Sequence, residues 1–213
     1  MNMRSRRLTA GACAVGLGAI MLVGVAGMAA AEEQYGDGEV DVNVQIADIS
    51  EPGVLAMTVA STSTTLTENG STEVERQFTG QLPTVTITDT RSAAEIPAGA
   101  GWYVLGTASD FTGDAGQPAI GAGHLGWAPN LIDGGEAGLV SEGDVVDTVM
   151  DAEDPDAQLP FGLVDQELLA MAHGSAEILP EGQWTANAAL FLRTPATVAA
   201  GGYTATLTLS LFE

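Results

Sequence analysis

Carboxylates are the only reactive side chains that this chain carries in abundance, with 28 Asp and Glu residues against two His and one Cys. They are densest between Asp151 and Asp156, where four lie within six residues. Oxygen ligands of this kind suit Ca²⁺, so Asp151, Asp154 and Asp156 are weak candidates for a calcium site. Their spacing fits neither an EF-hand loop nor a glycine-rich nonapeptide repeat. We therefore expect a solvated loop, with no bound metal or other cofactor.

Two carboxylates at a suitable separation could also hydrolyse a glycosidic bond. A chain with this many acidic residues contains such a pair by chance, so finding one is no evidence for a glycosidase. His124 and His173 are the only histidines, and neither a His-Glu-x-x-His nor a Gly-x-Ser-x-Gly motif occurs. We therefore expect that the protein is not an enzyme. A secreted carbohydrate-active enzyme is kept as a third hypothesis, behind the two non-enzymatic functions given at the end of this section.

Three aromatic side chains could contact sugars, because sugar faces stack on aromatic rings. Trp102, Trp127 and Tyr103 are the candidates for contact with a glycan or with the cell envelope. The alternative is packing, since an aromatic side chain on a sandwich strand usually buries a large apolar area against the facing sheet. Packing is favoured for Trp102, whereas the two roles are balanced for Trp127.

Arg91 is one of only six arginines in a chain without lysine, so we expect it to pair with a carboxylate. The predicted partner is Asp110, in a bidentate pair that would tie two segments together. A structural role is favoured over ligand recognition.

The first 31 residues have the layout of a secretory signal peptide. A positively charged head precedes an apolar run, and Ala29–Ala31 forms a small-residue cleavage site. A transmembrane anchor, a lipoprotein signal at Cys13 and twin-arginine export are weaker alternatives. We expect residues 1–31 to be removed, residues 32–38 to form a flexible leader, and the protein to be secreted.

The charge of the remaining chain excludes several partners. Beyond residue 31, three arginines stand against all 28 acidic residues, and there is no lysine. Nucleic acid is excluded because nothing would neutralise its phosphates, and anionic wall polymers would repel the chain on average. The sequence closes on neither a sorting motif nor an apolar tail. We therefore expect no covalent anchor and no stable membrane insertion after signal cleavage.

Alternating apolar and polar residues predict a series of half-buried strands. The predicted strands are 40–46, 54–60, 84–88, 102–105, 188–192 and 203–212. In the last, Tyr203, Ala205, Leu207, Leu209 and Leu211 share one face. The single helical candidate is residues 165–173. Many short strands separated by turn residues predict an antiparallel sandwich or barrel with long loops, in a single domain over residues 39–213.

Three blocks of sequence carry a family resemblance. They are residues 78–91; residues 101–104 with 109–112 and 125–129; and Pro195 with residues 200–211. Together they resemble the WxL-type surface proteins of Gram-positive bacteria, and more closely their actinobacterial relatives. Two positions depart from the motif for which the family is named: Val104 stands in place of Leu, and Leu207 stands in place of Trp.

The resemblance implies an immunoglobulin-like β-sandwich that associates non-covalently with the cell envelope. Such domains are thought to bind peptidoglycan and often occur with partner surface proteins. We therefore expect a secreted, non-enzymatic protein held at the cell wall by peptidoglycan or by another surface protein. The alternative is an extracellular structural subunit, adhesin-like or pilin-like, that assembles through its edge strands.

Overall fold

The computed structural model describes residues 43–46, 51–133, 138–151 and 161–213. The expected signal peptide, the expected leader, Asp154 and Asp156 lie outside these residues. The strands of the described residues all belong to one compact unit, Ile49–Glu213.

Antiparallel strands make up nearly all of the regular structure, which confirms the predicted all-β, sandwich-like fold. The strands are β1 Leu55–Val59, β2 Thr67–Glu68, β3 Glu75–Gln81, β4 Val85–Asp89, β5 Trp102–Ala108, β6 Thr112–Gly113, β7 Leu125–Asp133, β8 Val140–Glu142, β9 Glu167–Ala172, β10 Gln183–Pro195, β11 Tyr203–Thr204 and β12 Leu207–Phe212. Helix within the described residues is limited to three short 3-10 turns: η1 Ala122–His124, η2 Gly162–Val164 and η3 Ser175–Glu177.

The first sheet is built around β10, the longest strand. β7 pairs with one edge of β10, whereas β4 and then β3 pair with the other. β3 and β4 run in the same direction along that edge and are interrupted at Pro83, which has no N–H to donate. The backbone N–H of Leu82 still donates to the carbonyl of Ala188 at 2.8 Å. β1 and β2 complete the sheet on the outside of β4 and β3.

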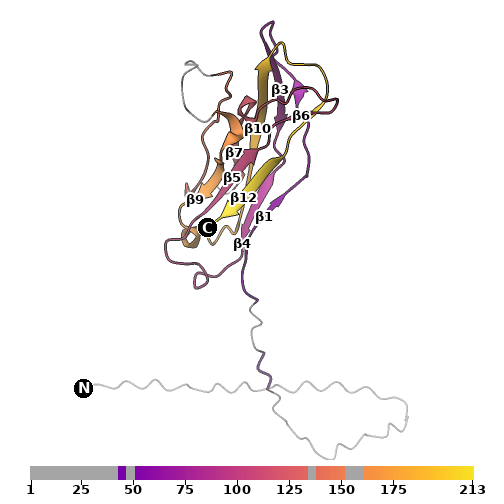
Figure 1. Cartoon of the computed structure of the whole chain (residues 1–213). Helices are drawn as coiled ribbons and strands as arrows, with labels where there is room; N and C mark the ends of the chain where they lie inside the picture. The colour runs from indigo at the N-terminus through magenta and orange to yellow at the C-terminus, as the bar shows by residue number, and fades with distance from the viewer. Residues whose placement is uncertain (1–42, 47–50, 134–137, 152–160) are drawn as a thin grey trace, which may run out of the picture. The chain divides into compact units, whose positions relative to one another are not determined.

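The second sheet has the strand order β12-β5-β9-β8, and β11 pairs separately with β6. Both sheets appear in Figure 1, where β5 and β12 lie beside each other. The core lies between the two sheets. Trp102 from β5 meets Trp184 from β10 with their ring centroids 5.4 Å apart, and both side chains are fully buried.

Most of the predicted strands are confirmed. β1, β4, β5 and β10 include or overlap the predicted segments, and Val85 and Ile87 of β4 point inward with no exposed surface. The C-terminal segment is split into β11 and β12, but the expected apolar face does pack against the core. At its start the hydroxyl of Tyr203 donates to the carbonyl of Ala199 at 2.9 Å.

Two predictions were wrong. Residues 165–173 contain strand β9 in place of a helix, because β9 hydrogen-bonds to β5 on one side and to β8 on the other. Two-sided pairing outweighs the weak helical spacing of its apolar residues. Residues 43–46 form no strand, and Val44 and Ile46 are 81% and 85% exposed; residues 40–42 lie outside the described residues.

The packing of β7 on β5 yields a direct test of the sandwich. A Cβ atom at Gly106 of β5 would lie 2.5 Å from Cη2 of Trp127. Gly106→Ala should therefore lower the free energy of unfolding by about 1–3 kcal/mol, as overpacking of a core does. The measurement is chemical denaturation followed by tryptophan fluorescence.

Gly121→Ala is the matched control, because the nearest atom to its added Cβ, Oδ1 of Asp110, is 3.8 Å away. It should change stability little. Equal losses in the two variants would contradict the packing of Trp127 against β5.

Candidate functional site

Trp102 and Trp127 do not reach the surface. Both are 0% exposed, so neither can stack on a glycan, and their role as contact residues is corrected to core packing. The reason is the pleat of each strand: both side chains point between the sheets, where they bury large apolar areas. Tyr103, the neighbour of Trp102, points to the opposite face of β5 and is 38% exposed.

Tyr103 is part of an aromatic pair on the outer face of the second sheet. It lies opposite Phe212 of β12, with ring centroids 5.3 Å apart and ring planes inclined by only 18°. Phe212 is 37% exposed. On the other side of Tyr103, Met171 of β9 lies directly opposite in the strand register and is half-buried.

The pair continues into a wider apolar surface, which we call the outer patch. Its members come from β5, β9 and β12 and are Tyr103, Leu105, Leu168, Met171 and Phe212. Leu105 pairs with Leu168 one row along from Tyr103, and Ser210 of β12 pairs with Leu105. The outer patch is therefore apolar and uncharged, with a hydroxyl at its β12 side.

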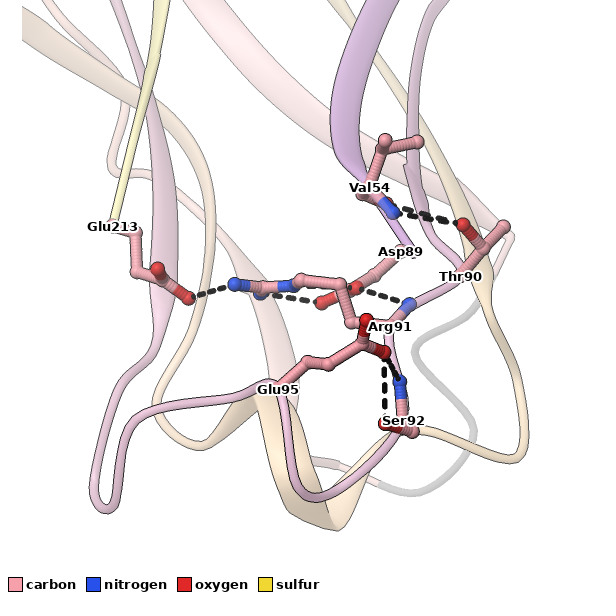
Figure 2. Close-up of polar contacts among 7 residues, drawn as sticks. All are labelled: Val54, Asp89, Thr90, Arg91, Ser92, Glu95 and Glu213. Carbon is pink, nitrogen blue, oxygen red and sulfur yellow. Dashed lines mark hydrogen bonds and ion pairs between the residues drawn. The ribbon is translucent and has the colours of Figure 1, made fainter. Parts of the chain in front are cut away.

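Arg91 lies at one end of the sandwich, in the polar cluster drawn in Figure 2. Its Nε and Nη2 donate to the two carboxylate oxygens of Asp89 at 2.8 and 2.7 Å, which is a bidentate pair. Its Nη1 donates to Oε1 of Glu213 at 2.6 Å. The expectation that Arg91 pairs with a carboxylate holds, but the partner is not Asp110.

Asp110 has a different role. It is exposed, and its Oδ1 accepts a hydrogen bond from the backbone N–H of Ala122 at 2.9 Å, which fixes the start of η1. The proposed Arg91–Asp110 pair is therefore corrected. Asp89 is two residues from Arg91 and already at the end of β4, so forming that pair orders little additional chain.

The Arg91 cluster joins three strand ends. Asp89 ends β4, Glu213 follows β12, and Val54 precedes β1 and donates its N–H to Oγ1 of Thr90 at 3.0 Å. Close by, the carboxylate of Glu95 accepts hydrogen bonds from the N–H and hydroxyl of Ser92 (Figure 2). The guanidinium side chain is only 10% exposed and donates from each of its three nitrogens to a carboxylate, so the cluster is structural.

The contacts between Arg91 and Asp89 shift the pKa values of both groups. Burial would raise the pKa of Asp89, but hydrogen bonds and charge from Arg91 outweigh it, so the pKa lies below its ordinary value. The side-chain hydrogen bonds that Arg91 donates to Asp89 are the main reason that the pKa of Arg91 is raised. At Glu167, by contrast, burial raises the pKa, with a smaller contribution from Asp165.

The other two arginines beyond residue 31 are also paired. Arg76 of β3 makes a bidentate pair with Glu68 of β2. Arg193 of β10 pairs with Oδ1 of Asp151, and the second oxygen of Asp151 accepts hydrogen bonds from the N–H and hydroxyl of Thr148. Asp151, a calcium candidate, is therefore engaged within the protein.

The described residues hold no group of three or more His, Cys, Asp or Glu side chains placed to bind a metal ion. One of the two histidines is tied to the backbone, since Nδ1 of His124 lies 2.6 Å from the carbonyl oxygen of Arg193. None of the described helices is long and apolar enough to cross a membrane.

Comparison of the chain with protein-family models, curated proteins and solved structures gave no match. The resemblance to WxL-type proteins thus remains an interpretation of the sequence blocks. Sequence reasoning missed Phe212 and Glu213 as site residues. The alternation of the C-terminal segment does place Phe212 on the outer face, which was the available signal.

The Asp89–Arg91 pair can be tested by substitution. Asp89→Asn removes the charge that is bonded to a nearly buried guanidinium, and should lower the free energy of unfolding at pH 7 by about 3 kcal/mol. Glu213→Gln should cost less than about 1 kcal/mol, because Glu213 is more exposed. Denaturant titrations measure both, and a larger loss in Glu213→Gln would contradict this ranking.

The same pair predicts a pH dependence. Because the pKa of Asp89 is lower in the folded state, its contribution is complete above the unfolded value of about 3.9. The contribution is lost as the pH falls through the folded pKa. The stability difference between the unchanged protein and Asp89→Asn should therefore be constant near neutrality and shrink below about pH 4. A difference that grew on acidification would overturn the assignment.

Proposed function

We propose that this protein is a secreted, non-enzymatic module that attaches without a covalent bond to the cell wall, through an uncharged part of a wall glycan such as peptidoglycan. The observation that carries the proposal is the outer patch. The predicted signal peptide and the resemblance to WxL-type surface proteins support it independently.

The charge of the chain narrows the kind of contact. With 28 acidic residues, the protein repels anionic wall polymers on average, so attraction must come from a surface that does not use charge. The outer patch supplies such a surface, with the rings of Tyr103 and Phe212 for stacking and the nearby hydroxyls of Thr208 and Ser210 for hydrogen bonds.

The buried tryptophans do not contribute to this contact. Trp102 and Trp127 are buried in the core on the inner side of β5. Because successive side chains of a strand point to opposite faces, burial of Trp102 places Tyr103 on the outer face. The proposal assigns no catalytic role to any residue. A partner surface protein, the other retention route expected from the sequence, would be recognised by loss of retention when the walls are first treated with protease.

A sedimentation assay with purified cell walls tests the proposal. Tyr103→Ala and Phe212→Ala should each reduce the bound fraction by about fivefold or more, because each removes ring area on which a sugar can stack. The matched control is Ile132→Ala, which truncates an exposed apolar side chain, 48% exposed, on β7 of the other sheet. Equal losses in all three variants, or no loss in the first two, would contradict a glycan contact at the outer patch.

Salt should affect this binding in an unusual direction. Binding by opposite charges weakens as salt rises, whereas here salt screens repulsion between an acidic protein and an anionic wall. The bound fraction should therefore stay constant or rise between low and moderate ionic strength. Release of the protein by moderate salt alone would show that charge, and not the outer patch, holds it.

A further inference from the structure

An apolar pattern typical of a strand lies near the N-terminus, in residues 40–46. Val40, Val42, Val44 and Ile46 alternate with Asp41, Asn43 and Gln45, which is the pattern of a half-buried strand. In the described residues 43–46 the side chains of Val44 and Ile46 are 81% and 85% exposed. Exposed apolar side chains at every second position indicate a segment that can bind another surface as a strand.

β12 offers an edge to which such a segment can add. It pairs with β5 on one side only. The N–H of Ser109 donates to the carbonyl of Thr206 at 2.9 Å, so residues 206, 208, 210 and 212 direct their backbone groups toward β5. Leu207, Leu209 and Leu211 therefore direct their N–H and C=O groups to the free edge.

The hydrophobic core is also incompletely covered along the free edge of β12. Leu207, Leu209 and Leu211 pack against the core, yet each is only partly buried, whereas Trp102 and Val104 on neighbouring β5 have no exposed surface. An added strand with apolar residues at every second position would extend the inner layer over these leucines. Its backbone would complete the hydrogen bonds of the edge.

β12 carries none of the features that usually block an edge strand. Its sequence, Leu-Thr-Leu-Ser-Leu-Phe, contains no proline, glycine or charged residue. Other outer strands are shorter or carry charge: β2 has two residues and includes Glu68, and β8 has three and includes Glu142. β1 is uncharged but one residue shorter than β12, and serves below as the comparison.

From these observations we propose that residues 40–46 of one copy of this chain add as a strand to the free edge of β12 in a second copy. This goes beyond attachment to the wall and does not require it. Each copy carries both a donor segment and an acceptor edge, and the two are different surfaces. Such head-to-tail contacts produce rings or open filaments and not only dimers.

The first experiment measures assembly of the exported protein by size-exclusion chromatography with light scattering. A series of oligomers that shift with concentration is expected. Val44→Asp combined with Ile46→Asp should raise the dissociation constant about a hundredfold or more, because two buried apolar side chains are lost from the interface. The melting temperature should not change, since both side chains are exposed in the single copy.

The control adds the same charge to the same segment on the opposite face. Asn43→Asp combined with Gln45→Glu should retain assembly, because these positions alternate with Val44 and Ile46 and face outward in an added strand. A monomeric unchanged protein, or equal loss of assembly in both double variants, would overturn the proposal.

The second experiment locates the edge. In a Cys13→Ser background the chain has no native thiol. A copy with Asn43→Cys or Gln45→Cys is mixed with a copy carrying Thr208→Cys and oxidised. A disulfide-linked pair is expected, because cross-strand neighbours lie within disulfide range. Thr58→Cys on β1 is the control acceptor, since Thr58 is also exposed on an outer strand.

The possible results separate the occupants of this edge. Cross-links to position 208 that exceed those to position 58 support the proposal. Equal or greater linkage to position 58 overturns the choice of β12. When both thiols are placed on one chain, linkage found only within single copies would show that the segment occupies its own β12, which also overturns it. Wall binding by the outer patch is measured separately, so either hypothesis can fail alone.

Discussion

The interlocking of tryptophans between two sheets is the constraint on which the rest of the structure depends. Trp102 and Trp184 meet across the core, and Trp127 reaches from β7 onto Gly106 of β5, where an added Cβ would lie 2.5 Å from the indole ring. The indole N–H groups of Trp102 and Trp127 are buried without a hydrogen-bond partner among the described residues. Such burial costs free energy, so the gain from apolar packing must exceed it. This packing fixes the pleat of β5 and, through it, places Tyr103 on the outer face.

The few arginine side chains beyond residue 31 all have structural roles. Each of the three arginines beyond residue 31 pairs with a carboxylate from another turn or strand, at Glu68, at Asp89 with Glu213, and at Asp151. In the described part of the chain, every arginine is thereby already paired with a carboxylate of the protein. The surface available for recognition is accordingly an uncharged one, which is consistent with a contact built from aromatic and hydroxyl groups.

The alternation of apolar and polar residues predicted many of the strands from the sequence alone. It succeeded for β4 and for the C-terminal segment, where Val85, Ile87 and the leucines of β12 face inward at every second position. It failed for β9, because the run Leu-Leu-Ala-Met-Ala has no clear period and its conformation is decided by two neighbouring strands. Glu213, the second partner of Arg91, was missed for a related reason. A sequence shows which acids are near in the chain or in a shared block, but Glu213 is 122 residues away and meets Arg91 only when the sheets close.

That long separation between Arg91 and Glu213 has a consequence for the order in which the chain folds. β5 completes its pairing only when β12 is present, and Arg91 gains its contact with Glu213 only when residue 213 is present. Closing so large a loop is entropically costly and slow. The two-layered form can therefore be completed only once the last strand is available, and it cannot be built up strand by strand from the N-terminal end.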